Sequence, residues 1–234
     1  MVKLCRKLFK SEDNSHDAAR MHSEALDQVL GFRVFEIEEK LLSRAIEKMP
    51  EGSHKTWGQA LHAGNQTWVG LSHQTLQTPY NELREICEQL NPPPKSCMID
   101  LGAGYGRLGL VLGGLYPDVT FIGYEYVPER VLEGQRILSL NGCENAELLE
   151  GDLASELFQL PVAEYYFLYD YGTLSHIRKT LLQLEKIAET KRFKVIARGN
   201  GVRSLIQYEF PWLANVYPVV HKEHYSIFSM SQEL

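Results

Sequence analysis

The sequence predicts an α/β fold in which helices cover both faces of one mostly parallel, seven-stranded sheet. Three observations lead to this expectation. From residue 97 to residue 197, short apolar segments alternate with helical segments, and such alternation forms right-handed βαβ units. The tail, residues 214–230, contains two β segments separated by residues 221–224, which predicts a C-terminal antiparallel hairpin. Two helical segments stand near the start and predict an N-terminal helical extension.

The extension is expected to hold one helix over residues 15–30, which Gly31 ends, and a second over residues 35–49. Residues 54–78 mix polar, glycine and aromatic residues without periodicity, which favours an irregular segment. A further helix is expected over residues 79–90, before a run of three prolines. We therefore divide the chain into a helical extension (1–53), an irregular lid or linker (54–80) and an α/β domain (81–234).

Within the α/β domain, the periodicity changes between two and 3.6 residues. Strands are expected over residues 97–101, 119–126, 146–150, 164–169 and 193–197. Helices are expected over residues 107–115, 128–141 and 174–189. Pro128 suits the first turn of its helix, where a missing N–H group costs nothing.

Composition excludes several classes of protein. The 234 residues carry a formal net charge of −6, so no overall basic bias points to nucleic acid. Four widely spaced cysteines form no C-x-x-C pair, and the eight histidines show no ligand spacing, so we expect neither a metal site nor a disulfide framework. No apolar run reaches the ~18–20 residues that span a membrane. We expect a cytoplasmic protein with reduced thiols.

The motif that bears on function lies between the strand at 97–101 and the next helix. It reads Asp100-Leu-Gly102-Ala103-Gly104-Tyr-Gly106-Arg107. Glycines in such a loop permit a tight turn and let a ligand approach the bare backbone. The helix that follows presents free N–H groups at its start.

Three details separate this loop from a dinucleotide-binding loop. Arg107 stands where that fingerprint needs its third glycine, which disfavours NAD and FAD. Asp100, two positions before the first glycine, suits a cationic ligand better than a pyrophosphate. Glu125 ends the next strand, where an acidic side chain can accept both ribose hydroxyls.

With these residues, the stretch from Met98 to Leu153 resembles the class I S-adenosylmethionine-dependent methyltransferases, which implies a Rossmann-like fold and S-adenosylmethionine as cofactor. The resemblance implies that Glu125 holds the ribose and that Asp152 and Leu153 meet the adenine. It places Asp170 and Tyr171 on the substrate side, as candidate catalytic residues. The expected cofactor-binding residues are Asp100, Gly102, Ala103, Gly104, Gly106, Glu125, Tyr126, Asp152 and Leu153.

A narrower resemblance rests on Thr78-Pro79-Tyr80 before the first strand and on Gly123-Tyr-Glu125-Tyr126 at the end of the second. These segments are similar to those of the Dot1-like protein-lysine methyltransferases. The resemblance implies that Thr78 and Tyr80 close over the cofactor; alternatively, they only begin a helix with Pro79 in its first turn.

The sequence therefore predicts an S-adenosylmethionine-dependent methyltransferase. A protein lysine or a small molecule is favoured as methyl acceptor over RNA, because the net charge is acidic. Two alternatives stay open: a module that binds the cofactor without turnover, and an NAD-type oxidoreductase. The N-terminal helices could recognise the substrate or form an oligomer contact.

Overall fold

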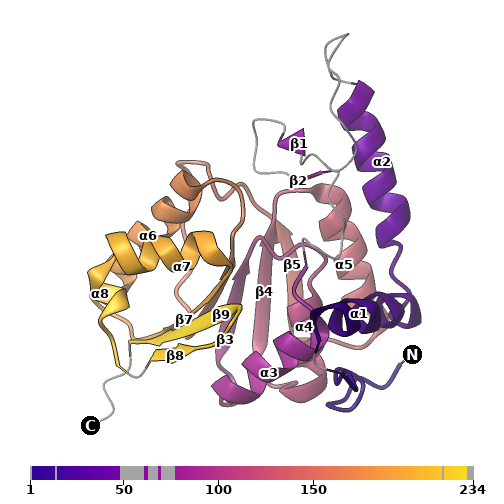
Figure 1. The fold of residues 1–234 in the computed structure, drawn as a ribbon, viewed down its shortest axis with the longest axis horizontal. Coiled ribbons are helices and arrows are strands. Elements are labelled where there is room, and N and C mark those ends of the chain that lie inside the picture. The colour runs from indigo at the N-terminus through magenta and orange to yellow at the C-terminus, as the bar shows by residue number, and fades with distance from the viewer. Residues whose placement is uncertain are drawn as a thin grey trace.

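The computed structural model describes residues 2–13, 15–47, 61–62, 68–69, 77–217 and 219–230. A central sheet separates two groups of helices (Figure 1). Helices α1 (His16–Leu30), α3 (Tyr80–Leu90), α4 (Arg107–Leu115) and α5 (Pro128–Leu140) pack on one side. Helices α6 (Leu174–Ala188), α7 (Asn200–Glu209) and α8 (Pro211–Ala214) pack on the other. This doubly wound arrangement confirms the predicted fold class.

The sheet has seven strands in the order β5-β4-β3-β6-β7-β9-β8. The first five, β5 (Ala146–Glu150), β4 (Thr120–Glu125), β3 (Cys97–Leu101), β6 (Tyr165–Tyr169) and β7 (Lys194–Arg198), run parallel. Strands β8 (Val219–His221) and β9 (Tyr225–Ser229) form the expected antiparallel hairpin beside β7. The chain places β4 on one side of β3 and β6 on the other. Because these strands are parallel, their carboxyl ends meet at one edge of the sheet, where such sheets bind ligands.

The helices expected from the sequence are present with bounds that agree to within two residues. Ser15 caps α1, and its side chain accepts a hydrogen bond from the Ala18 N–H. Gly31 ends α1 in the left-handed conformation, at φ 87°. Helix α2 (Val34–Glu47) follows after a short link.

Helices α7 and α8 were missed by the sequence analysis, which left residues 198–213 unassigned. Only Val202, Leu205 and Ile206 of α7 are buried, and glycines at 199 and 201 obscure that short pattern. The first N–H groups of α7 donate two hydrogen bonds to the Asp170 carboxylate, about 30 residues earlier in the chain. No local sequence signal reports such a long-range cap.

The N-terminal extension contributes to the same core as the α/β domain. Phe9 is fully buried and stacks on Tyr80 of α3, with ring centroids 5.7 Å apart. Leu26 and Leu30 of α1 join them. Leu26 and Leu30 are therefore buried in the core that α1 shares with α3, and Asp27, between them, is buried as well.

The lid or linker expected over residues 54–80 lies mostly outside the described residues. Strands β1 (Leu61–His62) and β2 (Trp68–Val69) pair antiparallel within it. The proposed division of the chain at residues 53 and 80 stays a prediction. Within the described residues, no helix has both the length and the apolar character needed to cross a membrane.

Candidate cofactor-binding site

The glycine loop turns sharply after β3. Gly102, Gly104 and Gly106 all have positive φ, at 83°, 57° and 75°. The N–H groups of Gly102 and Ala103 both donate to the Tyr124 carbonyl of β4 at 2.9 Å. A Cβ at Gly102 would lie 2.7 Å from the Cβ of Tyr171, so only glycine fits there without a shift. The loop is thus fixed between β4 and the segment after β6.

Asp100 lies just before this turn, as the second-last residue of β3, with 6% of its surface exposed. Burial, and secondly the charge of Glu125, raise the pKa of the Asp100 carboxyl to about 8. No described residue donates a hydrogen bond to its carboxylate or forms an ion pair with it. A buried acid in this state favours a cationic ligand, because such a ligand would supply the missing positive charge.

Glu125 ends β4 and its carboxylate contacts the glycine loop directly. Its Oε2 accepts from the Gly104 N–H at 2.9 Å, and its Oε1 accepts from the Val127 N–H at 3.0 Å. The Arg130 guanidinium of α5 lies 3.8 Å from Oε1. A carboxylate offers about four acceptor positions, so the two backbone bonds leave capacity for ribose hydroxyls.

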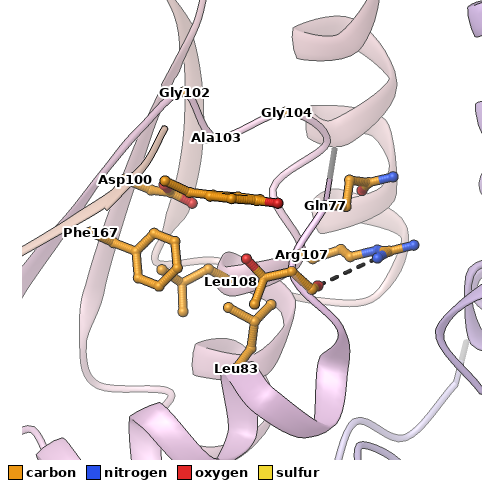
Figure 2. Close-up of a pocket in the computed structure, with 11 residues that line it drawn as sticks. Gln77, Leu83, Asp100, Gly102, Ala103, Gly104, Arg107, Leu108 and Phe167 are labelled. Carbon is orange, nitrogen blue, oxygen red and sulfur yellow. Dashed lines mark hydrogen bonds between the residues drawn. The ribbon is translucent and has the colours of Figure 1, made fainter. Parts of the chain in front are cut away.

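A small cavity of about 30 Å³ opens beside the loop. Figure 2 shows Asp100 and Phe167 on one side of it and Gln77 and Arg107 on the other. Thr78 and Tyr169 also line it. The cavity therefore joins the end of β3, the end of β6 and the residues before α3.

No family model matches the chain. Over 103 residues, 44% of the chain, it is 29% identical to an "Uncharacterized RNA methyltransferase" of Lactobacillus johnsonii, and the match spans 21% of that protein's length. Among solved structures, it is similar to precorrin-6Y C5,15-methyltransferase from Geobacter metallireducens, with TM-score 0.52, 17% identity and coverage of 68% of this chain and 91% of that one. An RNA methyltransferase from Salinibacter ruber, in complex with S-adenosyl-L-homocysteine, gives TM-score 0.50 and 16% identity, with coverage of 68% and 95%.

The chain has the class I S-adenosylmethionine-dependent methyltransferase fold. In this methyltransferase fold, the structure brings Asp100, Gly102, Ala103, Gly104 and Glu125 together, as the sequence predicted. The buried, unpartnered Asp100 carboxylate and the remaining acceptor capacity of Glu125 fit the cation and the ribose of S-adenosylmethionine. The assignment of each residue to a part of the cofactor stays a prediction.

The residues expected at the adenine follow β5 of the methyltransferase fold. Leu153 is buried and Asp152 is exposed. Asp152 Oδ1 accepts from the Ala154 N–H at 3.0 Å, which shapes a turn. The Gly151 N–H donates to the Glu125 carbonyl at 2.9 Å and so holds this turn beside the end of β4. Tyr126, which directly follows β4, is half-buried.

Asp170 and Tyr171 follow β6, and both side chains already have partners. The Asp170 carboxylate accepts from the N–H groups of Gly201 and Val202 at 3.0 and 2.7 Å. The Tyr171 hydroxyl donates to Thr180 of α6, inside the core. Burial raises the pKa of Tyr171 above its ordinary value. Neither side chain lines the cavity of Figure 2, and a catalytic role for them stays a prediction.

Arg107, which the sequence analysis used only as evidence against a dinucleotide, begins α4 and is almost completely buried. Its guanidinium pairs with Asp27 of α1 and donates to the Thr78 carbonyl at 3.4 Å. The ring of Tyr80 lies beneath it, 5.0 Å from the guanidinium carbon. Tyr80 therefore supports Arg107 at the end of the loop, and Thr78 lines the cavity. That Thr78 and Tyr80 close over the cofactor stays a prediction.

The sequence analysis missed Asp27, Glu38 and Arg130 as residues of this region. Asp27 and Glu38 look like ordinary charges on amphipathic helices. The one available signal was Arg107, because an arginine buried at a helix start requires a carboxylate partner. Among the described residues, no group of three or more histidine, cysteine, aspartate or glutamate side chains could hold a metal ion.

Proposed function

We propose that this protein transfers a methyl group from S-adenosylmethionine to an acceptor that enters beside β6. One observation carries the proposal: the glycine loop places the unpartnered Asp100 carboxylate and the Glu125 carboxylate at the carboxyl edge of a methyltransferase sheet. The cofactor would supply an electrophilic methyl group on a sulfonium cation. Its charge complements Asp100, and its ribose hydroxyls complement Glu125.

The chain's own residues contribute mainly by positioning. Holding two reactants in line can lower a barrier by about 7–11 kcal/mol. Phe167 and Tyr169 supply apolar walls to the cavity, which would limit water beside a bound methyl donor. The backbone after Tyr169 is held by Asp170 and Tyr171 through their bonds to α7 and α6. These contacts support a role for the two residues in shaping the acceptor loop.

The charges of the described edge favour a neutral or cationic acceptor, such as a lysine side chain or a small amine. The three buried arginines here each bind a carboxylate: Arg107 with Asp27, Arg130 with Glu38 and Arg198 with Glu82. A phosphate backbone needs cationic partners, whereas these cations are already neutralised. A protonated amine is a cation, so acidic surroundings do not repel it as it enters. It must then lose its proton before the methyl group is transferred.

RNA is the second candidate acceptor. The partial sequence match to an RNA methyltransferase and the structural similarity to another favour it. Both relatives are distant, and only the acceptor side of the site distinguishes these candidates. An NAD-type oxidoreductase is disfavoured, because the bound Arg107 fills the place of the third glycine.

The test is a calorimetric titration of the purified protein with S-adenosylmethionine and, separately, with NAD. We expect micromolar binding of S-adenosylmethionine that Glu125→Ala abolishes, and no binding of NAD. Transfer of a labelled methyl group to total protein, small amines or total RNA then identifies the acceptor class. Binding without transfer to any acceptor would favour a non-catalytic module, and absence of binding would overturn the proposal.

A further inference from the structure

We infer that Glu38 of α2 is a positioning residue for the cofactor's ribose, and that it acts through Arg130 on Glu125. The inference rests on the proposed function and deepens it, because it makes the N-terminal extension part of the cofactor site. It concerns a residue outside the region of the family resemblance, more than sixty positions before the glycine loop.

The first step is the contact between Glu38 and Arg130. Glu38 Oε1 accepts from Arg130 Nε at 2.8 Å, and Glu38 Oε2 accepts from Arg130 Nη2 at 3.0 Å. Two parallel bonds of this kind fix the plane of a guanidinium as well as its position. Both side chains are largely buried, at 12% and 9% exposure. The pair therefore joins α2 to α5 where little water reaches the two charges.

The second step is the contact of Arg130 with Glu125. With Nε and Nη2 directed at Glu38, the remaining Nη1 lies 3.8 Å from Glu125 Oε1. Burial alone would lower the pKa of Arg130, but Glu125 and Glu38 together raise it above its ordinary value. The guanidinium therefore stays charged next to Glu125. This charge offsets the repulsion between Glu125 and the neighbouring Asp100.

The third step is the contact of Glu38 with the glycine loop. The Tyr105 hydroxyl donates to Glu38 Oε1 at 2.8 Å, and Tyr105 stands between Gly104 and Gly106. Phe32, just before α2, meets the Tyr105 ring edge-on, with centroids 6.1 Å apart. Glu38 is thus bonded both to the loop that donates to Glu125 and to the arginine beside Glu125. Glu38 therefore acts on the Glu125 carboxylate through two contacts, one with Arg130 and one with Tyr105 of the loop.

The choice of ligand separates a displaced Glu125 carboxylate from a general loss of stability. We would titrate the full chain with S-adenosylhomocysteine and with its 2′,3′-dideoxy analogue, which lacks the hydroxyls that Glu125 would bind. The variants are Glu38→Gln and Arg130→Met. The matched control is Arg33→Gln, because Arg33 also ties the extension to α5, through Glu133, but does not touch Glu125 or the loop. Thermal unfolding of each variant is measured alongside.

The wild type is expected to prefer S-adenosylhomocysteine over the analogue, and Glu38→Gln and Arg130→Met are expected to reduce that preference about tenfold. Arg33→Gln should lower the unfolding temperature and leave the preference unchanged. The charge swap E38R/R130E should regain stability without regaining the preference, because it sets a carboxylate beside Glu125. If Glu38→Gln lowers stability and leaves the preference intact, the residue is only structural and the inference fails alone. If the wild type binds neither ligand, the proposed function fails with it.

Discussion

The Asp27 carboxylate of α1 accepts two hydrogen bonds from the Arg107 guanidinium, at the first residue of the helix that follows the glycine loop. Both side chains are almost completely buried, at 7% and 3% exposure. The Tyr80 hydroxyl donates to the same carboxylate at 2.8 Å. Asp27 of the N-terminal extension therefore belongs to the buried polar contacts behind the candidate cofactor site.

Breaking this buried pair should strongly destabilise the fold. Asp27→Asn leaves the Arg107 charge uncompensated, and we expect a loss of about 3–5 kcal/mol in the free energy of unfolding. The double variant Asp27→Leu with Arg107→Met removes both charges and should lose much less. Urea unfolding measures both. An Asp27→Asn loss no larger than that of Arg178→Gln, in an exposed pair with Glu209, would contradict the expectation.

Cofactor affinity should rise with pH and level off above about pH 8. With its pKa raised to about 8, Asp100 is largely protonated at neutral pH. A cationic ligand favours the ionised form, so its binding releases a proton and strengthens as pH rises. The ligand's own amino group also titrates near pH 8, and it cancels in the ratio of wild type to Asp100→Asn. Calorimetry from pH 6 to 9 should show that this ratio increases; a constant ratio would rule out the linkage.

The same raised pKa has a consequence for stability without ligand. Between about pH 4, where the unfolded chain ionises, and about pH 8, the folded state holds a proton on Asp100 that the unfolded state has lost. Stability therefore falls with rising pH over this window. We expect Asp100→Asn to reduce this slope in urea unfolding series taken between pH 5 and 8. An unchanged slope would show that Asp100 ionises normally in the fold.

Two glycines should lose stability on substitution by alanine for different physical reasons. At Gly134 of α5, a Cβ would lie 2.2 Å from Leu148 Cδ1 and 2.7 Å from the Tyr105 carbonyl, so Gly134→Ala should cost about 1–3 kcal/mol of stability. At Gly104, the space within 4 Å is open, and the positive φ costs about 1–2 kcal/mol.

The affinity for S-adenosylhomocysteine tests whether a ligand approaches the backbone at Gly104. Gly104→Ala should lose affinity even at temperatures where the variant is fully folded, because we expect the added methyl group to stand on the side from which a ligand reaches the loop. Gly113→Ala, whose Cβ would lie 2.6 Å from Cys143 Sγ and meets no residue of the loop, should bind normally at temperatures where it is folded. Wild-type affinity in Gly104→Ala would show that no ligand approaches this part of the backbone.

Tyr171→Phe tests the loop after β6. Removal of the hydroxyl bonded to Thr180 should lower the free energy of unfolding by about 1 kcal/mol. If the loop orients the acceptor, kcat should fall while the affinity for S-adenosylmethionine stays constant. Thr180→Val, which removes the same bond from α6, is the matched variant. Divergent kcat values for the two would indicate that the tyrosine hydroxyl itself takes part in transfer.

The sequence was sufficient to predict the sheet and most helices, because their signals are local. Gly31 ends α1, Pro128 begins α5, and the apolar segments that became β3 and β5 have the predicted bounds. The loop residues and Glu125 were predicted for the same reason: a glycine motif and a strand end lie close together in sequence. Helix α7 was missed, since its cap comes from Asp170.

The polar contacts behind the site were not predictable in the same way. Asp27 and Glu38 stand on helices whose solvent-facing charges look alike in sequence. Which charges become buried depends on how α1 and α2 pack against α3 and α5, and those contacts join residues 80 and 92 positions apart. Periodicity reports which face of a helix is apolar and carries no information about which distant arginine a single carboxylate meets.

Chain order gives these ties a consequence for biosynthesis. Asp27 with Arg107, and Glu38 with Arg130, are both complete once about 130 residues have been translated. The central strand β3 gains its second neighbour, β6, only after residue 165, and the closing hairpin follows after residue 219. A ribosome-bound chain thus already contains every described partner of the Glu125 carboxylate before β6 has been made, so we expect this half of the candidate site to assemble ahead of the rest.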